Sequence, residues 1–250
     1  MNAMTAERDR RELLITAIAD LLEGAGHVAV GASLPIPAAG ALLLRARNER
    51  EGRPPIRISI LGSKRHNFFT NGGVELFDCA AQGRVDAFFL GGGQIDGGGN
   101  INLVGTGDYP TSNVRWPGSF GSAYLYHLVP RVILFREEHS PRVLVKRVDF
   151  VSATAVTPGV SRRGGPHALL TNMALFDFDK ATCGFRLRSV HPPYSTADIR
   201  ANTGFDYEEA ENVPVTTLPD AATLSLIRGR ILDELAETYP AFAKLMVEAA

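Results

Sequence analysis

Residues 85–102 read VDAFFLGGGQIDGGGNIN, an apolar run that leads directly into a glycine-rich segment. Six of the twelve residues from 91 to 102 are glycine, whereas glycine makes up about 7% of an average protein. The second triplet predicts a hairpin between 94–95 and 101–102, because the tip of such a turn needs positive φ. The first triplet, Gly91–Gly93, follows the end of a predicted strand, and glycine there lets another backbone or a thin ligand chain approach closely.

Strands and helices alternate on both sides of this segment. We expect an opening helix over 10–23, a strand over 27–33, a helix behind Pro35 and Pro37, a strand over 56–61, a helix over 72–83 and a strand over 85–90. Further strand candidates are 143–153, 167–179 and 184–192, and apolar residues at helical spacing predict a closing helix over 221–237. This order predicts an α/β fold with an open, mostly parallel sheet and flanking helices, built as one domain over 1–250.

The composition is that of an ordinary globular protein, with 45% hydrophobic and 21% charged residues in 250. A net charge of −1 with scattered basic residues argues against nucleic-acid binding. Asp20 and Glu23 interrupt the apolar positions of the opening helix, so the N-terminus predicts an amphipathic helix and neither a signal peptide nor a membrane span. We expect a cytoplasmic protein with no metal site, in which Cys79 and Cys183 are reduced core thiols.

The glycine segment lacks the patterns that bind nucleotides. No GxxxxGK[ST] is present, and no GxGxxG opens a helix. Open α/β sheets bind ligands at the carboxyl edge of their strands. A second glycine turn, RWPGSFGSAY (115–124), follows the first. Two such loops at one edge would form a slot whose backbone N–H groups suit a thioester oxygen.

The motif FFLGGGQIDGGGNINLVGTG (88–107), followed by PGSFGSAYLY (117–126), resembles the β subunits of class I coenzyme A transferases, in the glutaconate-transferase-like branch. The resemblance continues through VDFVSATAVTPGV (148–160), HALLTNMALFDFD (167–179) and the segment 184–207, which contains TGF. It covers roughly residues 25–235. It implies a second, α-type subunit in an α2β2 assembly, and an acyl-CoA substrate. No cofactor is implied beyond the coenzyme A that the substrate carries.

The transferases attack the acyl-CoA with a glutamate at the end of their second strand, a case of nucleophilic catalysis by a carboxylate. The matching stretch here is IRISILGSKRHNFF (56–69), with Gly62 and Ser63 near the position of the nucleophile. Residues 52–74 contain neither Asp nor Glu. The sequence is in this respect similar to the cholesterol ring-cleaving hydrolases, a branch that lacks the glutamate. The resemblance implies hydrolytic carbon–carbon cleavage of a steroid-derived ring carried as a CoA thioester.

This interpretation predicts a substrate site but no catalytic residue on this chain, the general base being expected from the α subunit. Pocket and acyl-CoA turn are expected to be formed by Gly91, Gly92, Gly93, Gln94, Asn100, Asn102, Gly118, Ser119, Phe120 and Gly121. Trp116 either walls the ring-binding cavity or belongs to a core or interface. Lys64 and Arg65 either contact the substrate or form a charged loop, and His66 is expected to be a solvated or interface residue.

Three alternatives remain open from the sequence. The chain is also compatible with a true CoA transferase whose carboxylate lies elsewhere, and with a non-catalytic subunit that stabilises its partner. A sugar-phosphate isomerase on a related sheet is less compatible, because it gives no role to the segment HPPYSTADIRANTGFDY (191–207).

Overall fold

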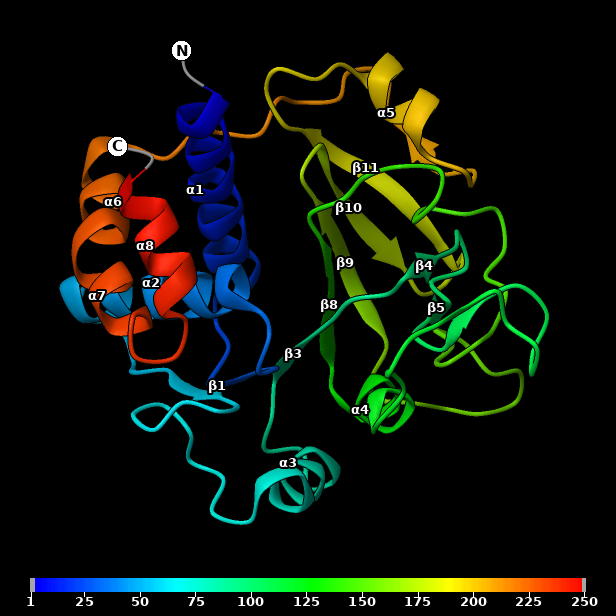
Figure 1. The fold of residues 1–250 in the computed structure, drawn as a ribbon, viewed down its shortest axis with the longest axis horizontal. Helices are drawn as coiled ribbons and strands as arrows, with labels where there is room; N and C mark the ends of the chain where they lie inside the picture. The colour runs from blue at the N-terminus through cyan, green and yellow to red at the C-terminus, as the bar shows by residue number, and fades with distance from the viewer. Residues whose placement is uncertain (1–2, 249–250) are drawn as a thin grey trace. The chain divides into compact units, whose positions relative to one another are not determined.

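The computed structural model of the protein describes residues 3–248. Its main sheet contains β1 (His27–Val30), β2 (Arg57–Ile60), β3 (Ala87–Leu90), β8 (Arg131–Arg136), β9 (Pro166–Thr171), β10 (Ala174–Asp179), β11 (Gly184–Val190) and β12 (Glu208–Glu209). The strands are hydrogen-bonded in the order β12-β11-β10-β9-β8-β3-β1-β2. Figure 1 shows β8, β9, β10 and β11 side by side. The pairs β1–β2, β8–β9 and β11–β12 are parallel, and β10 is antiparallel to β9 and β11. The predicted α/β fold with a mostly parallel sheet is confirmed.

The chain forms two compact units. The first comprises the residues up to Cys79, Arg84–Ala87 and the residues from Thr217 onward. The second comprises Ala80–Gly83 and Phe88–Thr216.

The first unit is built on a β–α–β motif. Four consecutive buried residues, HVAV, form β1, and α2 (Pro35–Arg50) begins with proline in its first turn, where the missing N–H costs nothing. The helix carries the chain to β2, which pairs with β1 in parallel so that Val30 lies opposite Ile60. Both strands, the helix and α3 (Gly72–Ala81) lie where the sequence predicts them.

A close helix crossing forms the core of this unit. The helix α1 (Ala3–Leu21) begins seven residues before the predicted start and packs on α2. Leu14, Ile18 and Leu43 are fully buried. A Cβ added to Gly40 would lie 2.3 Å from Cγ2 of Ile18, so the two backbones come together only because residue 40 lacks a side chain.

The closing helix is more broken than predicted. The chain forms α6 (Ala221–Leu226), one π-helical turn η1 (Ile227–Ile231) and α7 (Leu232–Leu235). It then turns and forms α8 (Pro240–Glu248), which the sequence analysis did not predict. In the first unit η1 and α7 pack on α2, and α8 packs on α7. The helix over 221–237 is therefore confirmed up to Leu235, and residues 236–239 form the turn that follows.

The second unit surrounds β8–β11 with small hairpins and helices. The hairpin β4 (Gln94–Ile95) with β5 (Ile101–Asn102) is confirmed, and Gly99 at its tip has φ +71°. A second hairpin pairs β6 (Gly105–Thr106) with β7 (Val114–Arg115), and the helices are α4 (Ser122–Leu128) and α5 (Thr196–Asn202). The predicted strand over 143–153 is wrong. This segment makes only single bridges from Leu144 to Ile95 and from Ala153 to Ile101, and it supports the first hairpin instead of joining the sheet.

Two histidines of the second unit are buried near the turn between β9 and β10. The ring of His139 lies between the hydroxyls of Thr171 and Thr203, at 2.8 and 2.9 Å. Nδ1 of His191 lies 2.7 Å from the hydroxyl of Thr216. Burial lowers the pKa of both His139 and His191 to about 4, so both rings are neutral at neutral pH.

The burial of the two cysteines and the apolar character of the helices bear on two further expectations. Cys79 and Cys183 are free thiols, but both are only half-buried, so the expected placement in the core is wrong. Within residues 3–248, no helix has the length and apolar character needed to cross a membrane.

Gly40→Ala should reduce the free energy of unfolding by about 1–3 kcal/mol, because the new methyl group forces α1 and α2 apart. Urea denaturation of the full chain measures this. Gly229→Ala is the matched control, since a Cβ there meets no atom within 4 Å. Equal stability of the Gly40→Ala variant and the unmodified chain would show that the crossing is not as tight as described.

Stability should also fall as the pH drops from about 6.5 toward 4. In this window the unfolded chain binds protons at His139 and His191 that the folded chain does not bind, at a cost of about 1.4 kcal/mol per pH unit for each ring. Urea titrations at several pH values should therefore show a smaller pH dependence for His139→Gln/His191→Gln than for the unmodified chain. An unchanged slope in the double variant would contradict the buried, neutral state of these rings.

Candidate functional site

Each unit holds part of the predicted site, and the two parts are described separately. In the first unit, the loop after β2 turns back tightly on its own strand. The N–H of Ser63 donates to the carbonyl of Ile60 (3.1 Å), and the N–H of Ile60 donates to the carbonyl of His66 (2.7 Å). Gly62 permits this turn with φ +90°. These hydrogen bonds therefore hold the charged loop after β2 in one backbone conformation.

The hydroxyl of Ser63 is fully engaged. It donates to Oε2 of Glu237 (2.7 Å) and accepts the N–H groups of Arg65 (3.2 Å) and His66 (2.9 Å). A hydroxyl has one hydrogen and two lone pairs, so no capacity remains for activation by a base. Ser63 therefore does not take over the role of the family's nucleophilic glutamate.

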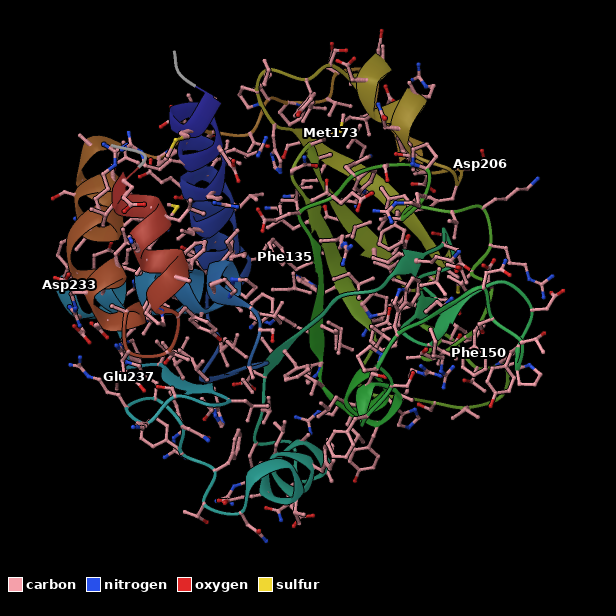
Figure 2. All side chains as sticks on the ribbon, viewed as in Figure 1. Phe135, Phe150, Met173, Asp206, Asp233 and Glu237 are labelled. Carbon is pink, nitrogen blue, oxygen red and sulfur yellow. The ribbon has the colours of Figure 1, made fainter. Side chains whose placement is uncertain are left out.

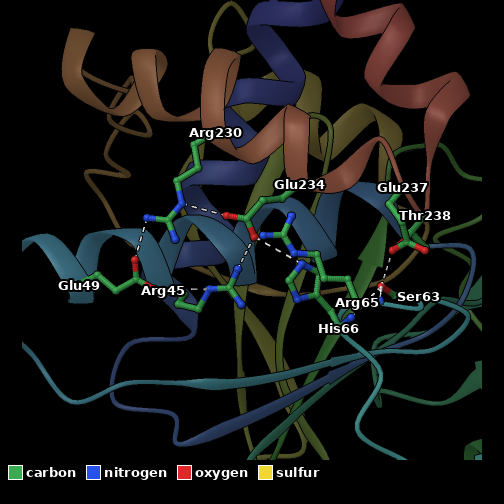
Figure 3. A network of polar contacts seen from close by, with 9 residues as sticks. All are labelled: Arg45, Glu49, Ser63, Arg65, His66, Arg230, Glu234, Glu237 and Thr238. Atoms are coloured by element: carbon green, nitrogen blue, oxygen red, sulfur yellow. Dashed lines mark hydrogen bonds and ion pairs between the residues drawn. The ribbon is translucent and has the colours of Figure 1, made fainter.

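His66 is buried and directed at Glu234, not at Ser63. Its Nε2 lies 3.4 Å from Oε2 of Glu234, whereas its contact with Ser63 is made by the backbone N–H (Figure 3). Burial lowers the pKa of His66, and the charge of Arg45 lowers it further. The expectation of a solvated or interface residue is wrong, because the side chain lies inside the first unit.

A network of charges anchors this histidine to the C-terminal helices (Figure 3). Arg45 bonds to Oε2 of Glu234, and Nε of Arg230 donates to Oε1 at 2.9 Å. Arg230 also pairs with Glu49 at 2.7 Å. Burial alone would raise the pKa of Glu234, but the Arg230 hydrogen bond and the charge of Arg45 outweigh it, so the pKa is lowered. This network attaches the loop after β2 to α7.

In the second unit, a ladder of carboxamides holds the glycine segment. Nε2 of Gln94 donates to Asp149 (3.1 Å), and its Oε1 accepts the side chain of Asn102 (2.8 Å) and the N–H of Asp149 (2.9 Å). Asn102, which is 0% exposed in relative terms, also donates to the carbonyl of Gly105 (2.7 Å). Nδ2 of Asn100 donates to both carboxylate oxygens of Asp96 at 3.1 Å. The three predicted pocket residues Gln94, Asn100 and Asn102 thus use their polar atoms within the chain and shape the segment as a scaffold.

The first glycine triplet accommodates neighbouring groups of the second unit. A Cβ on Gly93 would lie 2.2 Å from two ring carbons of Trp116, and a Cβ on Gly92 would lie 2.6 Å from the carbonyl oxygen of Gln94. A Cβ on Gly91 would lie 3.2 Å from the carbonyl oxygen of Phe135. The indole of Trp116 therefore packs against the glycine backbone. The glycines are required by the fold itself, and contact with a substrate stays a prediction.

The second glycine turn has an unusual backbone. Ser119 has φ +76° and Gly121 has φ +64°, directly before α4. A Cβ on Gly118 would lie 2.2 Å from the carbonyl oxygen of Leu103, and the hydroxyl of Ser119 donates to that of Ser152 at 2.9 Å. Phe120 projects from the turn with 83% relative exposure. The turn is thus fixed at its base and presents an apolar side chain outward.

A family model described as Coenzyme A transferase matches residues 59–202, more than half of the 250-residue chain. The chain belongs to the coenzyme A transferase family. The match includes the loop after β2, both glycine triplets and the turn at 117–121. The resemblance described in the sequence analysis is confirmed at the level of the family.

Individual relatives of this family differ in their reactions. A glutaconate CoA-transferase subunit of Acidaminococcus fermentans is 30% identical over 151 residues, which cover 57% of this chain and 56% of that protein. The chain therefore aligns with little more than half the length of this relative. The cholesterol ring-cleaving hydrolase IpdB subunit of Rhodococcus jostii (strain RHA1) is 26% identical over 247 residues, covering 93% of this chain and 96% of that protein.

Solved structures of the family superpose on most of the chain. The crystal structure of Rhodococcus jostii RHA1 IpdAB matches with a TM-score of 0.76 and 26% identity, covering 88% of this chain and 93% of that chain. The decarboxylase AibA/AibB matches with a TM-score of 0.74 and 26% identity, over 88% of this chain and 93% of that chain. Relatives of comparable similarity thus carry the names of a transferase, a hydrolase and a decarboxylase.

Two carboxylates of these regions were missed by the sequence analysis. Glu237 lies 174 residues from Ser63, and no local pattern connects the two. Asp149 lies 55 residues from Gln94 within VDFVSA, part of the segment that the sequence predicts as a strand. Its membership in a family-like motif was the only signal that pointed to it.

Asn102→Ala should reduce the free energy of unfolding by about 2–4 kcal/mol, because it leaves several buried donors and acceptors without partners. The carbonyl of Gly105 and the N–H of Val104 are among them. Asn212→Ala, at an exposed position of the same unit, should change the stability by less than about 0.5 kcal/mol. Equal unfolding midpoints of the two variants in urea would contradict the role assigned to the carboxamide ladder.

Proposed function

We propose that this chain is the β subunit of a heteromeric hydrolase that opens the last steroid-derived ring of a CoA thioester by hydrolytic carbon–carbon cleavage. The partner is an α-type subunit of the same family, in an α2β2 assembly in the cytoplasm. Family membership, and relatives that are all named as enzyme subunits, support an enzymatic role.

The observation that carries this proposal is the state of the loop after β2. Residues 52–74 contain no Asp or Glu, and the hydroxyl of Ser63 is saturated by hydrogen bonds within the chain. A loop of this kind offers no group of its own that an acyl-CoA would acylate. The IpdB relative aligns over nearly the full length of both chains, which favours its class of reaction over that of the shorter transferase match.

The reaction needs no protein nucleophile. A general base removes a proton from water, and the resulting hydroxide adds to a ring ketone of the substrate. The adjacent carbon–carbon bond then breaks, and its electron pair is delocalised onto the neighbouring thioester as an enolate. Protonation of the enolate carbon completes the reaction, and the former ketone becomes a carboxylate. Two oxyanions develop on the way, and hydrogen-bond donors stabilise them, each by about 2.7–4 kcal/mol.

On this chain, the turn at 117–121 is the proposed binding element for the thioester. Ser119 and Gly121 have left-handed backbones, the hydroxyl of Ser119 bonds to that of Ser152, and Gly118 packs against the carbonyl of Leu103, so the base of the turn is held in one conformation. Exposed Phe120 offers an apolar surface to a hydrophobic ring. The proposed pocket floor consists of the glycine triplet 91–93, Trp116 and the carboxamide ladder. The general base is supplied by the partner subunit.

A decarboxylase is the second candidate, because AibA/AibB superposes over most of the chain. Decarboxylation also breaks a carbon–carbon bond and leaves a carbanion, so the same donors would serve it. It differs in releasing CO2 and in consuming no water during bond cleavage. A CoA transferase differs from both, since it moves CoA to a second carboxylic acid.

The test is turnover of a cyclic diketone-type CoA ester by the purified complex in H2(18)O. The proposal predicts one 18O atom in the newly formed carboxylate, measured by mass spectrometry, with no need for an acceptor acid. Release of CO2 without 18O incorporation would identify a decarboxylase. Transfer of CoA to an added carboxylic acid, with the ring left closed, would identify a transferase. Either result would contradict the proposed hydrolysis.

A further inference from the structure

Three hydrogen bonds within the second unit hold Ser152. Its backbone N–H donates to the carbonyl of Ile101 in β5 (2.9 Å). Its Oγ accepts the N–H of Leu103 (2.8 Å) and the hydroxyl hydrogen of Ser119 (2.9 Å). Figure 2 labels Phe150, two residues before Ser152, and so marks the place of this segment in the second unit. Both the backbone and the side chain of Ser152 are therefore held in place.

The hydroxyl of Ser152 still has a hydrogen to donate. A hydroxyl group offers one hydrogen and two lone pairs, and the hydrogens from Leu103 and Ser119 occupy both lone pairs. Among residues 3–248, no group accepts a hydrogen bond from Oγ of Ser152. The side chain is only half-buried, so a ligand can reach this hydrogen. The hydroxyl of Ser63 differs, because it donates its hydrogen to Glu237.

Ser152 contacts the turn at 117–121, the proposed binding element for the thioester. Ser119 belongs to this turn and has φ +76°, a left-handed conformation that is unfavourable for a residue with a Cβ. Gly118 lies so close to Leu103 that a Cβ on it would be 2.2 Å from the carbonyl oxygen of Leu103. Unfavourable backbone conformations of this kind cluster at active sites and ligand-binding segments. The turn thus brings the hydroxyl of Ser119 to the same atom of Ser152 that accepts the N–H of Leu103.

We propose that Ser152 is a catalytic residue that donates its hydroxyl hydrogen to the thioester oxygen of the substrate, an inference that rests on the proposed hydrolysis. This oxygen gains negative charge when the carbon–carbon bond breaks and the electron pair is delocalised onto the thioester as an enolate. A donor that is already oriented stabilises this charge without reorganisation. The hydrogen remains on Oγ throughout, so Ser152 neither gains nor loses a proton. Ser119 and Leu103 act as positioning residues, because the hydrogens they donate fix the orientation of this hydroxyl.

The direct test is Ser152→Ala in the purified complex, with ring opening and 18O incorporation measured together. Loss of one oriented donor should reduce kcat about 100-fold and leave KM within about threefold, because the hydrogen bond strengthens as charge develops. Ser152→Thr keeps the hydroxyl and should recover most of kcat. Ser140→Ala is the matched control, since Ser140 is also half-buried in the second unit and its hydroxyl donates to Glu138 (2.8 Å).

The positioning role of Ser119 has its own test in Ser119→Gly. Glycine accepts the left-handed backbone of residue 119 without strain and removes only the hydroxyl. Ser152 then keeps its hydrogen, but its hydroxyl can rotate. We expect kcat to fall by less than in Ser152→Ala and KM to stay nearly constant. A loss in Ser119→Gly as large as in Ser152→Ala would contradict the assignment of Ser152 as the donor.

Ser152→Cys covers the case in which Ser152→Ala does not fold. A thiol occupies a similar space but is a weak donor, so kcat should fall while the unfolding midpoint stays near that of Ser140→Ala. Folded Ala and Cys variants at 152 whose kcat equals that of the control would overturn the inference. In that case 18O incorporation by the unmodified complex would leave the proposed hydrolysis standing. Absence of 18O from the product of the unmodified complex would instead contradict the proposed function itself, and the role of Ser152 with it.

Discussion

The hydrogen bond from Ser63 to Glu237 holds the loop after β2 against the turn that follows α7. The two residues are 174 positions apart in the sequence, and Oγ of Ser63 lies 2.7 Å from Oε2 of Glu237. It uses the only hydrogen of the Ser63 hydroxyl, and together with the N–H of Lys64 it fixes a carboxylate at the end of β2. The loop that carries the nucleophile in the transferases is thereby closed to acylation at Ser63, and a carboxylate arrives there from the C-terminus.

The carboxamide side chains of the second unit form hydrogen bonds within the chain and so stabilise its fold. Gln94 and Asn102 bond to each other and to Asp149 and Gly105, inside the glycine-rich segment. Buried amides of this kind are stable only when every donor and acceptor is paired. The rigid ladder keeps the hairpin, the indole of Trp116 and the loops from 103 to 107 in one arrangement.

Local structure was predictable where a single physical signal dominated. The buried run HVAV, the proline at the start of α2 and the glycines at the hairpin tip each specify one conformation, and all three elements occur as predicted. The segment 143–153 has the apolar pattern of a strand but bonds to a hairpin through two isolated bridges, because its pairing depends on distant residues. The break after Leu235 was missed for a related reason, since residues 236–239 follow the helical pattern only in part.

The candidate site was predictable in its loops but not in its contacts. Motif spacing identified both glycine turns, yet it could not show that the carboxamides bond inward or that His66 turns toward Glu234 and away from Ser63. Contacts such as Ser63–Glu237 depend on how the C-terminal helices pack on α2, which only the three-dimensional structure reveals. The absence of an acid between residues 52 and 74 was visible in the sequence, whereas the hydrogen bonds of Glu237 to this loop were not.

The intact mass of this chain during turnover tests the central claim most directly. Complexes would be quenched with borohydride or hydroxylamine while the acyl-CoA ester is being consumed, and the chain would then be weighed and mapped. If water is the attacking group, the mass remains that of the unmodified polypeptide at every time point. A reduced or hydroxamate-modified carboxylate on any residue of this chain, at Glu237 above all, would show that the protein itself attacks the thioester.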